Sequence, residues 1–146
     1  MKYTIVLEID PTDGEVSAWC DIDGSLMTTI APNTEGAVKN IQGLIEDFRL
    51  NEWKNVPKWE SIDGNTIEFD FEYSMIDFFD AFKAVKISEI AKLAGLNPAL
   101  VRAYAAGDKN PSLAQAKKIE EAAHRLAQSL LQVRVVPSST RPTQTA

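Results

Sequence analysis

Three short stretches near the start of the chain are rich in β-branched residues and alternate, at least in part, between apolar and polar side chains: residues 2–10, 15–21 and 25–30. A period of two is the pattern of a β-strand with one buried face. A Pro-Thr-Asp-Gly run separates the first two stretches, and Asp23-Gly24 separates the last two. Asp-Gly favours tight hairpins because both residues tolerate a positive φ, so the pattern predicts an antiparallel three-stranded meander.

A helical period begins after Asn33 and places six apolar residues on one face: Ala37, Val38, Ile41, Leu44, Ile45 and Phe48. A stripe of this width is buried in soluble proteins, so we expect the helix to lie on the sheet. Residues 51–65 lose the period, contain Pro57 and end in another Asp-Gly turn. That composition predicts a loop or a short strand.

Residues 66–73 alternate strictly between apolar and acidic side chains. The apolar positions are Ile67, Phe69, Phe71 and Tyr73. The acidic positions between them are Glu68, Asp70 and Glu72. Successive side chains of a strand point to opposite faces, so this stretch predicts a half-buried strand with one acidic face.

Residues 87–107 carry two short helical patterns joined by a tight turn. We expect Ser88 to cap the first helix and Gly95 to end it in the left-handed conformation. Asn97, which precedes a proline, marks the start of the second helix, and Gly107 marks its end. The pattern predicts a helix-turn-helix, a motif whose exposed second helix enters the DNA major groove.

Two further helices are predicted around this motif. Ser74 can cap a scaffold helix with four apolar residues on one side: Ile76, Phe79, Phe82 and Val85. Ser112 and Gln115 form a capping box for a long helix. Its apolar residues follow steps of three and four: Ala116, Ile119, Ala123, Leu126, Leu130 and Val133. This seam is longer than a minimal helix-turn-helix core needs, which favours a homodimer or a larger assembly.

Together these patterns predict an α+β protein of two domains. Residues 1–73 are expected to form a small antiparallel sheet with a helix, and residues 74–136 an all-α helix-turn-helix domain. Residues 137–146 have no apolar pattern, so we expect a disordered tail.

Charge is distributed unevenly along the chain, whose net charge is −6. Residues 1–74 hold 5 basic and 15 acidic side chains, a net of −10, whereas residues 75–146 hold 10 and 6, a net of +4. The first half is therefore suited to a basic partner and the second to a polyanion.

No apolar run approaches the length of a membrane span, and the first residues lack the apolar core of a secretion signal. We therefore expect a cytoplasmic protein that contacts no membrane. Cys20 is the single cysteine and His124 the single histidine, so neither a disulfide nor a zinc site is expected.

The helix-turn-helix strongly resembles the phage-repressor (Cro-type) class, in the order AxxAGLNPALVxxYxxGxxxPS. The first half resembles HicB: a strand, Asp-Gly, a strand, CDIDG where that family has PDLPGC, and NTEGA opening a helix. The resemblance covers nearly the whole chain. It implies a partial ribonuclease-H-like domain that neutralises a small basic HicA-like toxin, an mRNA-cleaving ribonuclease. It also implies a DNA-binding domain that represses the shared operon through an operator duplex.

Five candidate base-contacting residues lie at the start of the second helix: Asn97, Pro98, Ala99, Arg102 and Ala103. Asn97 is better explained as the helix cap than as a base contact. Arg102 could form a bidentate contact with guanine, or could be a solvated surface arginine. Ala99, Ala103 and Ala106 are either plain surface alanines or small residues that let the helix approach thymine methyl groups.

Three lysines, Lys109, Lys117 and Lys118, cluster near the capped start of the long helix. Backbone amides and cations together suit phosphate, so we favour phosphate contacts over a merely solvated face. In the first half, the acidic row of Glu68, Asp70 and Glu72 is the candidate surface for the toxin.

An enzymatic function is the less favoured alternative. A ribonuclease-H-like fold with clustered carboxylates would suit a metal-dependent nuclease. Four aspartates, Asp10, Asp13, Asp21 and Asp23, are instead expected in turns, where Asp is favoured by its backbone hydrogen bonds. We therefore expect no catalytic residue, cofactor or metal. A stand-alone repressor, whose first domain binds another partner, remains as the other alternative.

Overall fold

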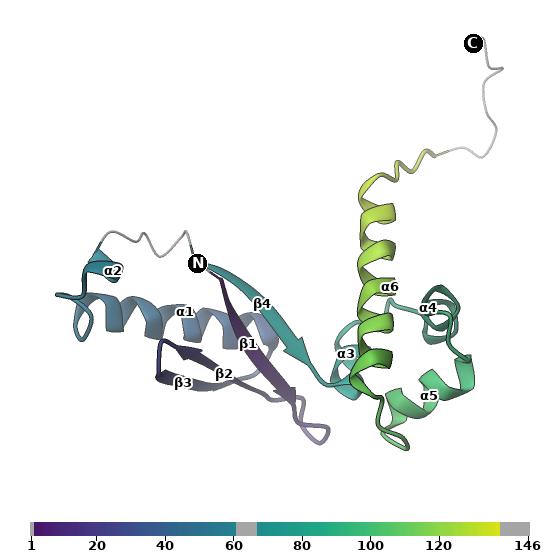
Figure 1. Ribbon diagram of the computed structural model, residues 1–146, viewed down its shortest axis with the longest axis horizontal. Coiled ribbons are helices and arrows are strands. Elements are labelled where there is room, and N and C mark those ends of the chain that lie inside the picture. Colours follow the sequence, from purple (N-terminus) through teal and green to yellow (C-terminus); the bar gives the residue numbers. More distant parts are fainter. Residues whose placement is uncertain (1, 61–66, 138–146) are drawn as a thin grey trace, which may run out of the picture. The chain divides into compact units, whose positions relative to one another are not determined.

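The computed structural model of the protein describes residues 2–60 and 67–137 (Figure 1). The chain divides into two compact units, Met1–Ala81 and Phe82–Ala146, called unit 1 and unit 2 below. The sequence placed this division near Ser74. The short helix α3 (Met75–Ala81), which Ser74 caps by accepting a hydrogen bond from the Asp77 amide, instead groups with unit 1.

Unit 1 is built on a four-stranded sheet in the order β3-β2-β1-β4. Its strands are β1 (Lys2–Ile9), β2 (Val16–Ile22), β3 (Ser25–Ala31) and β4 (Glu68–Tyr73). The first three form the expected antiparallel meander. β4, however, pairs with β1 in parallel, so the expectation of a wholly antiparallel sheet is wrong. A parallel neighbour requires a long crossover, and the chain between β3 and β4 is long enough to supply it.

The hairpin between β2 and β3 has the tight turn that its sequence indicates. Asp23 and Gly24 have φ angles of 51° and 92°, and Ile22 pairs with Ser25 across the turn. Two successive residues with positive φ are the signature of the turn that matches the twist of antiparallel strands.

The core of unit 1 lies between the sheet and helix α1 (Thr34–Leu50) (Figure 1). Asn33 caps this helix by accepting a hydrogen bond of 2.7 Å from the Gly36 amide. Of the predicted apolar stripe, Ala37, Ile41 and Ile45 are buried, and the other three residues pack against them.

Residues 51–56 form turns, in line with the expected loop, and the short helix α2 (Pro57–Glu60), which was not expected, follows them. Trp59 on α2 is buried and stacks on Trp53, with ring centroids 4.3 Å apart. Aromatic burial at the end of α1 therefore determines the path of this segment. The expected Asp-Gly turn at residues 63 and 64 lies outside the described residues.

Unit 2 contains α4 (Ile87–Ala94), α5 (Pro98–Ala106) and α6 (Leu113–Leu131). Their packed residues are Ile90, Ala91, Val101, Tyr104, Ile119 and Ala122. Gly95 and Gly107 end α4 and α5 with φ angles of 71° and 82°, as the sequence indicates. The α4–turn–α5 arrangement is therefore the predicted helix-turn-helix.

Three sequence expectations about the ends of these helices are wrong. α4 begins one residue before Ser88, and the N-cap is Lys86, which makes no side-chain cap bond. α3 ends at Ala81, short of the Val85 expected on the scaffold helix. α6 ends at Leu131, so Val133 lies beyond the helical seam. Most of the tail expected to be disordered, residues 138–146, lies outside the described residues. In the described part of the chain, no helix has the length and apolar character of a membrane span.

Candidate nucleic-acid and protein-binding surfaces

One face of α5 is available to a ligand. Ala99, Arg102 and Ala106 are exposed on it and Ala103 is half-buried, whereas Val101 and Tyr104 are buried. Positions three, four and seven residues apart share one side of a helix, so these four residues form one surface, called the α5 face below. Pro98, at the first helical position, is half-buried beside it.

Asn97 serves as the cap of α5. Its side-chain oxygen accepts a hydrogen bond of 2.8 Å from the Ala99 amide. This geometry matches the interpretation that we favoured over base contact. Arg102 is thus the longest polar side chain that the α5 face presents.

The backbone at the start of α6 forms a complete capping box. The Ser112 hydroxyl accepts from the Gln115 amide, and the Gln115 side chain accepts from the Ser112 amide.

Lys109 in the preceding loop and Lys117 and Lys118 on α6 are all exposed. Among the described residues no ion pair engages these three ammonium groups. They are therefore available to phosphate.

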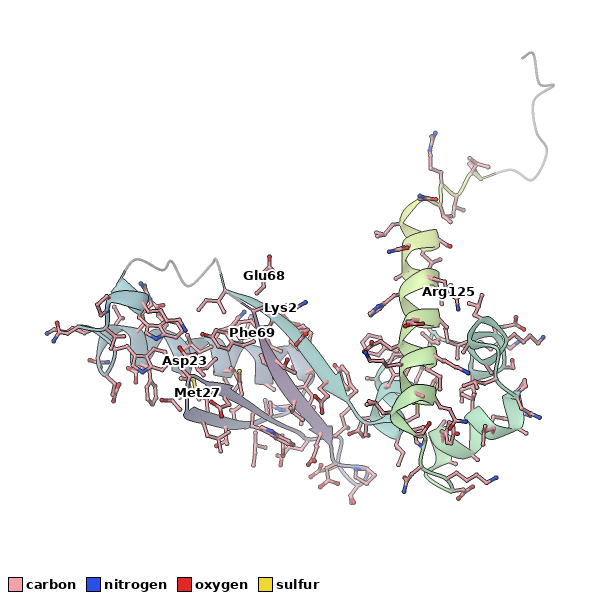
Figure 2. The ribbon with its side chains drawn as sticks, viewed as in Figure 1. Lys2, Asp23, Met27, Glu68, Phe69 and Arg125 are labelled. Atoms are coloured by element: carbon pink, nitrogen blue, oxygen red, sulfur yellow. The ribbon has the colours of Figure 1, made fainter. Side chains whose placement is uncertain are left out.

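Two contacts hold α5 and α4 against α6. The Tyr104 hydroxyl of α5 hydrogen-bonds to the Gln115 side chain at the start of α6. The Arg125 guanidinium of α6 donates to the Leu93 carbonyl of α4 (Figure 2). A helix fixed in this way presents its exposed face with little freedom, which favours recognition of a rigid duplex.

The second candidate surface is the face of the unit 1 sheet opposite α1, called the open face below. The strand register places Thr4 beside Asp70 and Val6 beside Glu72. Glu68 pairs with Lys2, and Figure 2 shows both at the same end of the sheet. The sequence thus correctly placed Glu68, Asp70 and Glu72 on one face.

The three carboxylates differ in their surroundings. Asp70 accepts a hydrogen bond of 2.6 Å from the Thr4 hydroxyl and lies 3.8 Å from the Lys2 ammonium. Within the described residues, neither Glu68 nor Glu72 takes part in an ion pair. Glu68 and Glu72 therefore carry more of the charge that a basic partner would meet.

The open face also has an apolar part, running from the edge strand β3 to the middle of the sheet, that sequence reasoning missed. Trp19 is half-buried there, next to Val6 in the strand register. On β3, Leu26 is 65% exposed and Ile30 is 61% exposed. Alternation within residues 25–30 could have identified them, because Leu26 and Ile30 share a parity opposite to that of the buried Met27.

The aspartates that raised the nuclease alternative mostly serve turns, as expected. Asp10, Asp13 and Asp21 each accept a hydrogen bond from a backbone amide two or three residues ahead, at 2.7 to 2.9 Å. Asp23 instead accepts from Lys58 at 2.7 Å and from the Tyr3 hydroxyl at 3.3 Å. Burial, followed by the Asp23 charge, raises the pKa of Tyr3. In the part of the chain that the structure describes, no group of three potential metal ligands forms.

Comparison of the chain with protein-family models, curated proteins and solved structures yields no match in any of the three.

Proposed function

We propose that the protein is an antitoxin that represses its own operon. Unit 2 binds an operator duplex through α5, and unit 1 binds and neutralises a small basic toxin that cleaves mRNA. The observation that carries the proposal is the helix-turn-helix of residues 87–107, with its two left-handed glycines and its exposed α5 face. The resemblance to HicB and the acidic open face support the toxin-binding part.

DNA binding by unit 2 is tested on the full-length protein with duplexes from its own promoter. The expected result is binding at low salt that weakens as salt is raised, because phosphate contacts release counterions. Arg102→Ala should weaken binding to the preferred duplex by roughly 1 to 3 kcal/mol and abolish discrimination at one base pair. If no promoter fragment is bound at low salt, the repressor function is wrong.

Partner binding by unit 1 is tested with the product of the adjacent reading frame. The full-length protein should bind this product and suppress its RNA cleavage, more weakly at high salt. The double variant Glu68→Lys with Glu72→Lys should lower the association rate at least tenfold, because complementary charge chiefly accelerates encounter. The control is Glu35→Lys with Glu52→Lys, which makes the same charge change at exposed positions of unit 1 away from the open face, one of them an ion-paired position on α1.

The same two tests also distinguish the antitoxin from a stand-alone repressor. If the intact protein binds its promoter but neither binds nor inhibits the neighbouring product, the antitoxin function fails and a repressor with another partner replaces it. A homodimer fits either function, since a helix-turn-helix dimer places two recognition helices on successive major grooves.

A further inference from the structure

The α5 face offers very few kinds of chemical contact. Arg102 is its single long hydrogen-bonding side chain, and the positions around it, Ala99, Ala103 and Ala106, present methyl groups. The side-chain oxygen of Asn97 is bound to the Ala99 amide. The contacts available to this face are therefore a guanidinium and methyl groups.

These contacts match two of the four bases. Adenine is usually contacted by Asn or Gln amides and cytosine by carboxylates, and the α5 face has neither. A guanidinium forms a bidentate pair with guanine, and a methyl group packs against the 5-methyl of thymine. An alanine face also lets the helix backbone approach the base edges closely, since no longer side chain stands between them.

We infer that α5 recognises thymine through its 5-methyl group, at positions on both sides of one guanine contacted by Arg102. This inference rests on the proposed DNA-binding function and specifies the sequence class of the duplex. Ala99 and Ala106 are separated by seven residues, which is about 10 Å along a helix. Base pairs are about 3.4 Å apart, so the thymines recognised by one α5 helix lie within about three or four base-pair steps.

The packing of unit 2 leaves two of the three alanines, Ala99 and Ala106, fully available for this role, and Ala103 partly so. Val101 and Tyr104 supply the buried side of α5, and the Tyr104 hydroxyl ties the helix to Gln115. The methyl groups of Ala99 and Ala106 are exposed, so the core does not require them. Packing an exposed methyl group against another methyl group removes both from water, which contributes favourable free energy to binding.

The test removes only the methyl group of thymine. The full-length protein is first used to select its preferred duplex from a random pool. Each thymidine in that duplex is then replaced, one at a time, by deoxyuridine, which keeps every hydrogen-bonding group. Replacement at two or more positions near the central guanine should weaken binding about threefold to fivefold each, the loss expected for one buried methyl.

A substitution in α5 tests whether this helix makes the contact with the thymine methyl group. Ala99→Gly should bind the thymidine duplex more weakly and should lose the difference between thymidine and deoxyuridine at one position. Its helix content, measured by circular dichroism, shows whether α5 is intact. The matched control is Ala127→Gly, at an exposed position of α6, which should keep the full deoxyuridine effect.

The outcomes separate this inference from the function on which it rests. If selection yields no preferred duplex, DNA recognition and this inference both fail. If a preferred duplex is found but every deoxyuridine replacement leaves affinity unchanged, the inference alone is overturned and the alanines are surface residues without a base contact.

Discussion

The Arg125 guanidinium, on α6, donates a 2.6 Å hydrogen bond to the backbone carbonyl of Leu93, in the last turn of α4. The last carbonyls of a helix have no partner within it. The Gly95 amide donates to the carbonyls of Ala91 and Lys92, and Arg125 donates to the next carbonyl, that of Leu93. A side chain 32 residues away thus completes the end of the first helix of the helix-turn-helix.

Arg125→Ala should therefore destabilise unit 2 by about 1.5 kcal/mol, the lower end of the net value of a hydrogen bond from a charged group, because Arg125 is exposed. The measurement is urea unfolding followed by helical circular dichroism. The three tryptophans lie in unit 1, so fluorescence should show an unchanged transition for that unit. Arg134→Ala, at an exposed position beyond the end of α6, is the control and should leave both signals unchanged.

Gly95→Ala and Gly43→Ala should change stability in opposite directions. An added Cβ meets nothing within 4 Å at either site, but Gly95 has a φ of 71° whereas Gly43 lies within α1. Gly95→Ala should cost unit 2 about 1 to 2 kcal/mol because an L-residue is strained in the left-handed region. Gly43→Ala should stabilise unit 1 by roughly 1 kcal/mol through helix propensity. Equal effects at the two sites would contradict this explanation.

Lys117→Ala should reduce the salt dependence of DNA binding. Each phosphate contact contributes about 0.9 to the slope of log affinity against log salt concentration, so the slope should fall by about one unit. Lys109→Ala and Lys118→Ala are expected to do the same. Lys39→Ala, on α1 of unit 1, is the control. A change of affinity with an unchanged slope would rule out a phosphate contact.

Stability should fall at alkaline pH because of Cys20. Burial, with a smaller contribution from the Asp21 charge, raises the pKa of this thiol from its ordinary value of 9.0 to about 11. Between these two values the unfolded thiol ionises and the folded one does not, so the free energy of unfolding falls as pH rises from 9 to 11. The fall attributable to Cys20 should be on the order of 2 kcal/mol. Cys20→Ala should not show this fall when the free energy of unfolding is compared at pH 8.5 and pH 11. An identical pH profile for both proteins would contradict this prediction.

Leu130→Glu combined with Leu131→Glu should dissociate a homodimer formed along α6. These side chains are 61% and 86% exposed, so their replacement should barely affect the monomer. Sedimentation equilibrium should show a lower mass and circular dichroism an unchanged helix content. Leu113→Glu, at the other end of α6 and 78% exposed, should leave the mass unchanged.

The sequence predicted the elements better than their directions. Glycines with a required positive φ marked the ends of α4 and α5, because few residues other than glycine tolerate that conformation. Alternation located β4 and its acidic row, but a period of two is the same in parallel and antiparallel strands. The pairing of β4 with β1, and its direction, depend on how the chain crosses from β3 to β4. No local sequence pattern indicates this crossing.

The candidate sites were likewise predicted only in part from the sequence. Helical spacing correctly placed Arg102 and Ala99 on the exposed side of α5. The apolar part of the open face was missed because β3 carries large apolar side chains on both faces, Met27 on one and Leu26 on the other. Sequence alone does not tell which of them is covered, since this depends on which face α1 occupies.

The parallel pairing of β4 with β1 also sets the order in which unit 1 can be completed during synthesis. β1 leaves the ribosome before the other strands of this sheet, yet one of its two edges is paired by residues 68–73. Until those residues emerge, β1 has an unpaired edge, the kind of edge that promotes wrong pairing between chains. Contacts so distant in sequence form slowly, because a long loop must close first. A nascent chain that stalls before residue 73 would therefore be prone to aggregation.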